Sequence, residues 1–364
     1  MQIKEIIQFL EQFAPLPYQQ SYDNSGLLVG DRSTELTTAL LTLDVTESVI
    51  DEAIANSCNL IIAHHPLIFK GLKSLTGKHW VERCVIKAIK NDIAIYAIHT
   101  NLDHVHLGVN KRICDKIGLS NLRTLSPKSE VLTKLTTFIP IADTQKVLDA
   151  LYAAGAGEVG NYDHCSFQVS GKGTFRPGEG TNPHIGAVNE DESVEENRVE
   201  VIFPTFLSGK ILSALNQAHP YEEVAYDLTP LSNKNQEVGS GMVGELPQEM
   251  DTNQFLKSLQ ETFKAQGIRH TNIHKKMIKK VAVCGGAGSF LLSRAIGAKA
   301  DIFITGDFKY HDFFEADNQI IVADIGHFES EQYTKDLLYD ILSEKFTNIA
   351  LRLSEVQTNP INYL

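Results

Sequence analysis

Five residues of types that bind metal ions are divided between the two ends of the chain. His64, His65 and Asp103 lie in the first third, and His327 and Glu331 lie near the other end. Imidazole and carboxylate ligands without thiolates suit zinc, iron, manganese or nickel, and the sequence does not choose among these metals. Two such ions bridged by a carboxylate would activate water as hydroxide and polarise an electrophile. Hydrolysis is therefore the first chemistry that this set of residues indicates.

The histidine pair comes first along the chain. His64 and His65 directly follow the apolar run 60–63, which we interpret as a buried strand. Adjacent residues in a strand point to opposite faces, but at the end of a strand they can diverge enough to hold two different ions. The alternative for the pair alone is one histidine hydrogen-bonded in the core and one on the surface.

The second pair, His327 and Glu331, has helical spacing. If a helix begins at residue 326 or 327, the two side chains share one face and can reach one ion. If Ser330 instead caps a later helix, the face argument weakens and Glu331 becomes a solvated side chain. Glu329 is a competing carboxylate, but its spacing of two from His327 should point it elsewhere. We therefore expect Glu331 to be the ligand.

Other polar residues lie beside these candidates. Asp103 could form an Asx turn with Asn101 rather than bind an ion. His99 could support a metal ligand from behind or could be a hydrogen-bonded core histidine. Asp307 and His311 could contact a ligand or the substrate, although Asp307 could equally be a helix cap. The residues alone single out no catalytic acid or base.

Two further motifs have weaker chemical meaning. The glycine-rich segment 285–289 follows an apolar run and precedes an expected helix, so its backbone amides could hold a phosphate. Its spacing matches no established nucleotide-binding loop, and a tight strand-to-helix turn is the favoured interpretation. The segment 219–223, His-Pro-Tyr-Glu-Glu, is interpreted as a structural turn, with ligand binding as the alternative.

Apolar runs and amphipathic segments alternate over the first part of the chain. This alternation predicts a largely parallel α/β sheet. Ligands in such sheets bind beyond the carboxyl ends of the strands, so we expect the candidate ligands along one rim of one sheet. The expected helices lie at 3–13, 46–54, 80–90 and 109–117, and the expected strands at 38–44, 60–63 and 93–98.

The pattern changes near residue 127 and changes back near residue 233. Between these points a strand–helix–strand order occurs twice, which resembles a ferredoxin-like module. We therefore expect an α/β fold in which residues 1–126 and 233–364 form one split α/β metal-binding domain. Residues 127–232 would form an inserted ferredoxin-like (PII/CutA-like) α+β domain. The expected strands beyond 127 lie at 134–140, 199–204, 224–228, 239–246, 279–284, 302–305, 320–324 and 351–353, and the helices at 143–153, 205–218, 251–263, 290–297 and 330–342.

Composition limits the classes of function. The chain has 364 residues, of which 43% are hydrophobic and 21% charged, as expected for a globular protein of two or three domains. Its net charge of -12 argues against nonspecific binding to nucleic acid or to an anionic membrane. No apolar run is long enough to span a bilayer, and the N-terminus does not match a signal peptide. The five cysteines form no C-x-x-C motif, so we expect a cytoplasmic protein with reduced, mostly buried thiols.

The segments that contain the candidate ligands resemble the Ngg-one-interacting-factor-three-like family, whose bacterial members are named GTP cyclohydrolase 1 type 2 homologues. The resemblance covers both flanks of the chain, and the segment 219–223 is similar to the PII-like domain that longer members carry. The matching segments are 23–27, 61–69, 96–103, 305–311 and 326–331.

The resemblance implies more than the spacing of the residues. Family members hold two divalent metal ions per chain. Carried over, His65 and Asp103 would hold one ion, His64 and His327 the other, and Glu331 would bridge them. Members assemble as ring-shaped homohexamers, and their name implies a GTP cyclohydrolase acting through metal-bound hydroxide. The alternative function is a metal-binding assembly with a regulatory or adaptor role through the PII-like domain.

Overall fold

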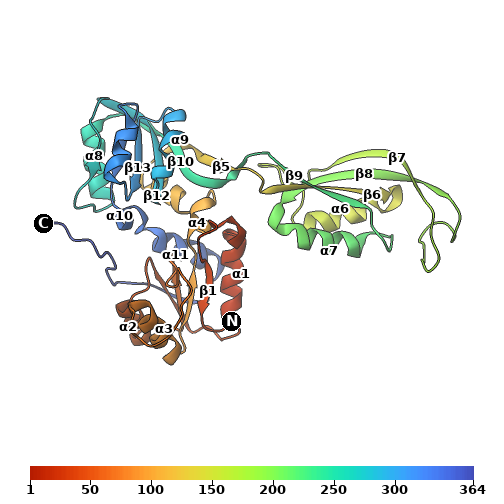
Figure 1. The fold of residues 1–364 in the computed structure, drawn as a ribbon, viewed down its shortest axis with the longest axis horizontal. Coiled ribbons are helices and arrows are strands. Elements are labelled where there is room, and N and C mark those ends of the chain that lie inside the picture. The colour runs from red at the N-terminus through yellow and green to blue at the C-terminus, as the bar shows by residue number, and fades with distance from the viewer. The chain divides into compact units, whose positions relative to one another are not determined.

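The computed structural model describes residues 1–364, which form two compact units (Figure 1). Unit 1 combines Met1–Pro127 with Gln236–Leu364, and unit 2 is Lys128–Asn235. The structure is a mixed α/β fold with three sheets, of which two lie in unit 1 and one in unit 2. None of its helices is both long and apolar enough to cross a membrane.

The first sheet of unit 1 has the strand order β1-β4-β3-β2-β15. The four strands from β4 to β15 are parallel, and β1 pairs with β4 in the antiparallel direction. The strands are β1 (Gly26–Val29), β2 (Thr38–Thr42), β3 (Leu60–Ala63), β4 (Ala94–Ala97) and β15 (Ala350–Leu353). The helices of this half are α1 (Ile3–Phe13), α2 (Glu47–Ala55), α3 (Trp80–Lys90), α4 (Thr100–His104) and α5 (Val109–Ile117).

The second sheet of unit 1 has the order β11-β14-β13-β12-β10-β5. Strands β12, β13 and β14 are parallel, whereas β10 and β11 pair with their neighbours in the antiparallel direction. The strands are β5 (Ser120–Lys128), β10 (Asn235–Asp251), β11 (Arg269–His270), β12 (Met277–Ala287), β13 (Ile302–Gly306) and β14 (Ile321–Asp324). The helices are α8 (Thr252–Thr262), α9 (Leu292–Gly297), α10 (His327–Glu331) and α11 (Thr334–Lys345), with a 3₁₀ segment at Tyr310–Ala316.

The expectation of one largely parallel sheet with the ligands along one rim was therefore wrong. The first sheet ends at β1 and β15, and strands β10 to β14 form a second sheet together with β5. The candidate ligands consequently come from two sheets. His64, His65 and Asp103 follow strands of the first sheet, and His327 and Glu331 follow β14 of the second.

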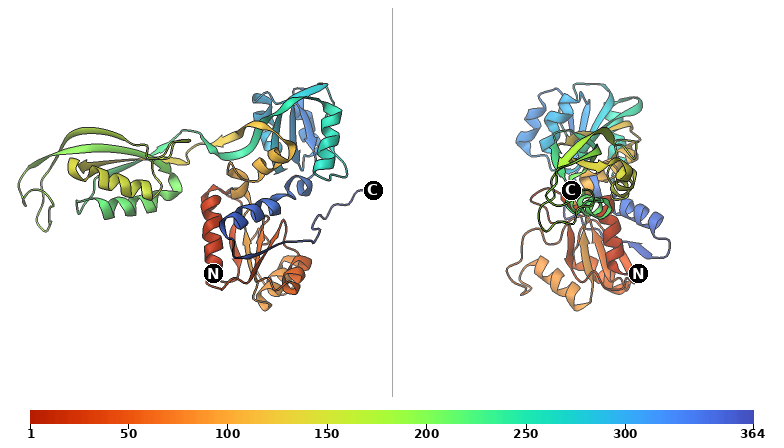
Figure 2. Two further views of the ribbon diagram at one scale, coloured as in Figure 1. Left: turned by 180° about the vertical axis from the view of Figure 1, so that it is seen from behind. Right: turned by 90° about the vertical axis from the view of Figure 1, so that its right-hand side faces the viewer.

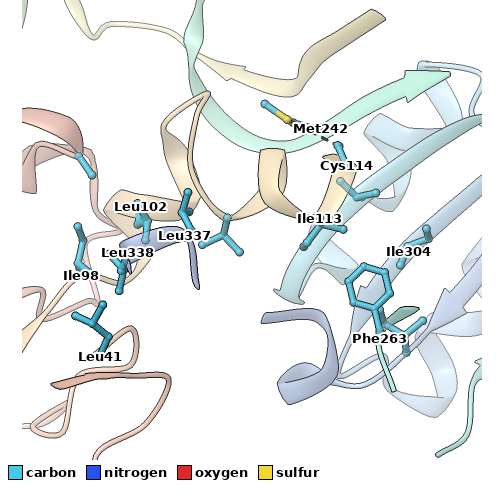
Figure 3. Close-up of a cluster of buried hydrophobic side chains, with 14 of the residues drawn as sticks. Leu41, Ile98, Leu102, Ile113, Cys114, Met242, Phe263, Ile304, Leu337 and Leu338 are labelled. Atoms are coloured by element: carbon cyan, nitrogen blue, oxygen red, sulfur yellow. Dashed lines mark hydrogen bonds between the residues drawn. The ribbon is translucent and has the colours of Figure 1, made fainter. Parts of the chain in front are cut away.

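One apolar core joins the two sheets of unit 1. Leu41 and Ile98 come from the first sheet region and Ile304 from the second, and all three belong to the same cluster of buried side chains (Figure 3). Helix α5 contributes Ile113 to this cluster, and helix α11 contributes Leu338. Burial of this shared core removes a large apolar area from water, which fixes the ends of the two sheets next to each other.

Unit 2 is a four-stranded antiparallel sheet with two helices. Figure 1 and Figure 2 show both helices on the same face of the sheet, whose strand order is β7-β8-β6-β9. Strand β7 was not predicted, because its glycines and exposed polar residues give no apolar alternation. The elements are β6 (Leu132–Pro140), α6 (Thr144–Ala153), β7 (Phe167–Phe175), β8 (Glu192–Pro204), α7 (Ser208–Ala218) and β9 (Tyr226–Leu231).

Candidate metal centre

Strand β3 ends at the histidine pair, and each imidazole is held by its Nδ1 atom. The backbone amides of His64 and His65 bond to the carbonyls of Thr42 and Leu43, so the pair continues the strand pairing past its formal end. His64 is fully buried and its Nδ1–H donates to the carbonyl of Ile98 at 2.8 Å. His65 Nδ1–H donates to Asp44 Oδ1 at 2.7 Å. Both rings therefore keep their Nε2 atoms for the site.

Helix α10 begins at His327, as the face argument required. His327 and Glu331 lie on one face, with His327 Nε2 3.1 Å from Glu331 Oε2. Gly326 makes this start possible, because it has a φ of 96° and a Cβ atom there would lie 2.1 Å from Glu329 Oε2. Glu329 points away from the site, where it accepts a hydrogen bond from Asn359. Glu331, rather than Glu329, therefore faces the other candidate ligands.

Glu331 is the centre of the cluster. Its Oε2 atom lies 3.0 Å from His65 Nε2, 3.1 Å from His327 Nε2 and 3.9 Å from His64 Nε2. Asp103 reaches the same place from α4, with its Oδ1 atom 3.6 Å from His64 Nε2. The structure thus brings together the five candidate residues.

Two of the groups of donor atoms that could hold a metal ion contain Glu331. His65, His327 and Glu331 make one group, and His64, Asp103 and Glu331 make the other, with the ligand atoms of each group within 4.8 Å of one another. Glu331 belongs to both groups. The resemblance paired His65 with Asp103 and His64 with His327. In the structure, His65 instead lies in one group with His327, and His64 lies in one group with Asp103.

Two unpaired atoms support a metal ion in the second group. His64 Nε2 and Asp103 Oδ1 are buried and have no hydrogen-bond partner. A buried polar atom without a partner is costly, and a bound ion would offset that cost by taking both atoms as ligands. Because His64 Nε2 lies 3.6 Å from Asp103 Oδ1 and 3.9 Å from Glu331 Oε2, the residues present fit a divalent cation with nitrogen and oxygen ligands.

The charges of the cluster compensate one another. Burial would raise the pKa of Glu331, but the adjacent histidines, His327 above all, hold it well below its usual range. Burial would lower the pKa of His65, but hydrogen bonds to Asp44 and Glu331 raise it to about 9. Burial would also lower the pKa of His327, but Glu331 and Asp307 raise it to about 11. Protons on the imidazoles thus neutralise the carboxylates where no cation does.

The pKa of Asp103 is raised, whereas that of the other carboxylate, Glu331, is lowered. Burial and the negative charge of Glu331 raise the pKa of Asp103 to about 7. The charges of His99 and His65 lower the pKa of Asp103 but do not offset this rise. A divalent cation between Asp103 and Glu331 would remove this repulsion.

Several residues behind the ligands fix their orientation. Asp307 Oδ2 accepts the Nδ1–H of His327 at 2.8 Å, in the supporting role considered from the sequence. Asp44 does the same for His65, and Thr358 donates to the other oxygen of Asp44 at 2.6 Å. Asp44 was not predicted from the sequence as a functional residue, although it ends the apolar run 38–44 and the histidine pair directly follows the next apolar run. Thr358 gave no signal in the sequence, because its role arises only from tertiary structure.

His99 forms a second supported imidazole beside the ligands. Its Nδ1–H donates to Asp23 Oδ1 at 2.8 Å, and one of its ring nitrogens belongs to a group with His64 and His65 that lies within 4.8 Å. Burial would raise the pKa of Asp23, but hydrogen bonds from His99 and Thr100 hold it well below its usual value. Asp23 therefore remains a carboxylate that orients the His99 ring. His311, by contrast, belongs to none of these groups and its ring lies against Tyr310.

The glycine-rich segment 285–289 is a tight turn that supports the centre. The amides of Gly285, Gly286 and Gly288 donate to Asn110, Ser330 and Thr305 side chains, so they are already occupied within the protein. Gly286 has a φ of 62°, and a Cβ atom there would lie 2.4 Å from Glu331 Oε1. The segment therefore makes room for the Glu331 carboxylate.

The comparisons with known proteins agree with one another. The family described as Duf34/NIF3 (NGG1p interacting factor 3) matches residues 1–360. A protein of Halalkalibacterium halodurans named GTP cyclohydrolase 1 type 2 homolog is 39% identical over 99% of this chain and 98% of its own length. A Bacillus subtilis protein of the same name is 38% identical over 99% of this chain and 98% of its own length.

A solved structure gives the same result in three dimensions. The crystal structure of a Bacillus cereus protein related to NIF3 superposes with a TM-score of 0.87 at 37% identity, and it covers 100% of this chain and 99% of that one. Since the matches in sequence and in structure both extend over the whole chain, the protein belongs to the Duf34/NIF3 (NGG1p interacting factor 3) family.

Proposed function

We propose that the protein is a hydrolase that depends on two divalent metal ions per chain and acts on a nucleotide or a related heterocycle. One observation carries the proposal: three imidazoles and the Asp103 carboxylate gather around Glu331, and two of the buried atoms in this cluster, His64 Nε2 and Asp103 Oδ1, lack partners. The printed name of the relatives, GTP cyclohydrolase 1 type 2 homolog, makes ring opening of GTP the first candidate reaction.

The two ligand groups assign the ions to residues. His65 and His327 would hold one ion, His64 and Asp103 the other, and Glu331 would serve both. Divalent ions bound there supply Lewis acidity, which activates water and polarises the substrate. The ions would be zinc, iron, manganese or nickel, because the ligands are nitrogen and oxygen atoms without thiolates.

The His99 and Asp23 pair supplies the proton transfer in this proposal. Asp23 accepts the Nδ1–H of His99, which leaves Nε2 as the nitrogen able to accept a proton. The ring lies beside His64 and His65, with ring centroids 5.3 Å apart in both cases. A proton released from water or substrate at the metal ligands would therefore have an acceptor close to the reacting atoms.

The proposal extends to the organisation of the chain. Unit 1 would be the split metal-binding domain, with boundaries near 126 and 233, and unit 2 the inserted PII-like domain. We further propose that the chains assemble as homohexamers, as the family resemblance implies. The antiparallel sheet of unit 2, with both helices on one face, supports a ferredoxin-like module.

A second candidate function is a metal-binding assembly with a regulatory or adaptor role through unit 2. The observation in its favour is that unit 2 supplies none of the five candidate ligands. Turnover separates the two functions. If protein with intact metal content and assembly converts neither GTP nor other nucleotides, the assembly role replaces the hydrolase.

The first test is the metal content of protein purified without added metal. About two ions per chain are expected in the wild type, as two ligand groups require. His65→Ala and Glu331→Gln should lose bound metal together with GTP turnover. His274→Ala and Glu344→Gln are matched controls, because both side chains are exposed and away from the site. Metal that is unchanged in His65→Ala and Glu331→Gln would refute the ligand assignment and the hydrolase with it.

A further inference from the structure

Unit 2 contains a cavity of about 760 Å³ that the proposed function does not use. Its floor is the sheet face opposite the helices: Val199 packs in the helix-side core, so Glu196 and Arg198 of the same strand face the other way. The volume is in the range of sites for small organic molecules. Its walls come from the segments 174–185 and 221–225.

Glu196 is the most unusual residue in this cavity. It is only 7% exposed, yet no lysine or arginine pairs with it. Its Oε1 accepts a hydrogen bond from the Tyr221 hydroxyl at 2.8 Å. A Cβ atom at residue 173 would lie 2.0 Å from Glu196 Oε2, so Gly173 leaves the space that the carboxylate occupies. A buried carboxylate with one neutral donor is costly, and a bound cation would offset the cost.

The other charges of the cavity do not supply that cation. Three cationic side chains line the cavity, and each forms an ion pair with an acidic residue outside the lining. The pairs are Lys172 with Glu195, Arg176 with Asp191, and Arg198 with Glu200. Glu222 and Glu223 line the cavity as well; Glu222 accepts the backbone N–H of Asn182, and neither carboxylate belongs to an ion pair. Once the three cations are neutralised by their own partners, the three carboxylates of the lining remain without an ion pair, which favours a positively charged occupant.

Aromatic rings complete the wall beside Glu196. The ring centroid of Tyr221 lies 5.8 Å from that of Phe175 and 6.3 Å from that of His184. Faces of aromatic rings attract organic cations, and Tyr is among the better donors of such contacts. Burial and the Glu196 acceptor raise the pKa of Tyr221, which keeps its hydroxyl protonated and donating.

The segment 219–223 gains a role from this arrangement. His219 Nε2–H donates to the carbonyl of Phe138 at 2.9 Å, and its Nδ1 accepts the backbone N–H of Tyr221 at 3.1 Å. Burial lowers the pKa of His219, in keeping with the neutral ring that this bonding requires. His219 and the following proline thus form a turn that places the Tyr221 hydroxyl at Glu196. The segment 219–223 is therefore both a structural turn and part of the cavity wall.

We propose that this cavity binds a small organic cation, with a protonated amine, amidinium or guanidinium group whose N–H groups donate to Glu196. The apolar body of the ligand would lie against the rings of Phe175 and Tyr221. The carboxylates without an ion pair and the aromatic wall select a cation over a neutral molecule of the same shape.

The test uses benzamidine as the probe and benzamide as its uncharged counterpart of the same shape, titrated into the full chain by calorimetry. Benzamidine should bind saturably, and benzamide should bind about tenfold more weakly or not at all. Glu196→Gln should weaken benzamidine by about tenfold, since Gln keeps the shape and loses the charge. Glu130→Gln, at an exposed turn of the same unit, is the matched control and should bind as the wild type does.

Three outcomes would overturn the proposal. They are equal binding of benzamidine and benzamide to the wild type, unchanged benzamidine affinity in Glu196→Gln, and no saturable binding of benzamidine at millimolar concentration. The comparison of the two probes uses wild-type protein alone, so it decides the matter even if Glu196→Gln fails to fold. Metal content is measured in the same samples and should not change, because no ligand of the metal centre lies in unit 2.

Discussion

The candidate metal centre of unit 1 and the cavity of unit 2 surround a buried carboxylate in different ways. Glu331 and Glu196 are 3% and 7% exposed, and each lies against a glycine that leaves room for it, Gly286 and Gly173 respectively. Glu331 is surrounded by imidazoles at 3.0 to 3.9 Å, whereas Glu196 meets a phenol and an open volume of about 760 Å³. The first arrangement suits a compact ion, and the second suits a larger cation.

The supports of the two sites differ as well. In unit 1 the Nδ1 atoms of His64, His65 and His327 are each bonded to an oxygen behind the ring, which fixes where Nε2 points. In unit 2 the cavity wall includes the loop 176–185, which follows β7 and precedes β8, together with the hydrogen-bonded turn at His219. Preorganised nitrogen ligands select a geometry, whereas a cavity with a loop wall selects charge and approximate size.

Alanine substitutions at the two glycines are expected to have the largest effects, and each should impair one site and leave the other unchanged. Gly286→Ala places a Cβ atom 2.4 Å from Glu331 Oε1 at a φ of 62°, so it should reduce metal affinity by about a hundredfold without removing a ligand. Gly173→Ala places a Cβ atom 2.0 Å from Glu196 Oε2 and should weaken benzamidine while leaving metal content intact. Metal content and calorimetric affinity are measured on both variants. If either variant lost both its bound metal and its affinity for benzamidine, the two sites would not be independent.

A smaller effect is expected from the residue behind His65. Asp44→Asn removes the charge that accepts the His65 Nδ1–H at 2.7 Å, which should weaken metal binding by about ten- to a hundredfold. Competition with a chromophoric chelator gives the affinity. Asp115→Asn is the control, because Asp115 is a half-exposed partner of Lys111 on the surface of α5. Equal affinities in the two variants would show that Asp44 does not support the ligand.

The sequence predicted those local features of the candidate metal centre that depend on neighbouring residues. His64 and His65 end a run of four apolar residues, and the spacing of His327 and Glu331 needs only a helix start at Gly326. These are features of neighbouring residues, which periodicity reports well. The prediction that Glu331 rather than Glu329 enters the site followed from the same helical geometry.

Features that depend on distant residues were not predictable in the same way. The separation of unit 1 into two sheets depends on which strands occupy the edges, and Ala350–Leu353 joins the first sheet from the far end of the chain. Thr358 supports Asp44 across 314 positions in sequence. Strand β7 has two glycines and an exposed surface, so only its pairing with β8 identifies it. Tertiary contacts decide such elements where local preference is weak.

The stabilisation that bound metal gives to the fold should depend on pH. The pKa of His65 is raised from 6.5 to about 9, so its proton stabilises the metal-free fold fully below pH 6.5, and this contribution is lost as the pH rises through about 9. A metal ion requires the neutral ring, and it also requires ionised Asp103, whose pKa is about 7. The difference in Tm between metal-loaded and metal-free protein should therefore widen from pH 6.5 to 9. A constant difference would mean that metal does not displace these protons.

The smallest expected effect lies in unit 2. Tyr221→Phe removes the hydroxyl that donates to Glu196 at 2.8 Å and keeps the aromatic face. Loss of one such bond costs about 1 kcal/mol, which corresponds to about fivefold faster hydrogen exchange in the strand that carries Glu196, measured by mass spectrometry. Benzamidine affinity should change by less than about threefold, since the carboxylate and the ring remain. A tenfold loss of affinity would instead mean that the hydroxyl contacts the cation directly, and the aromatic face would then be the minor part of the wall.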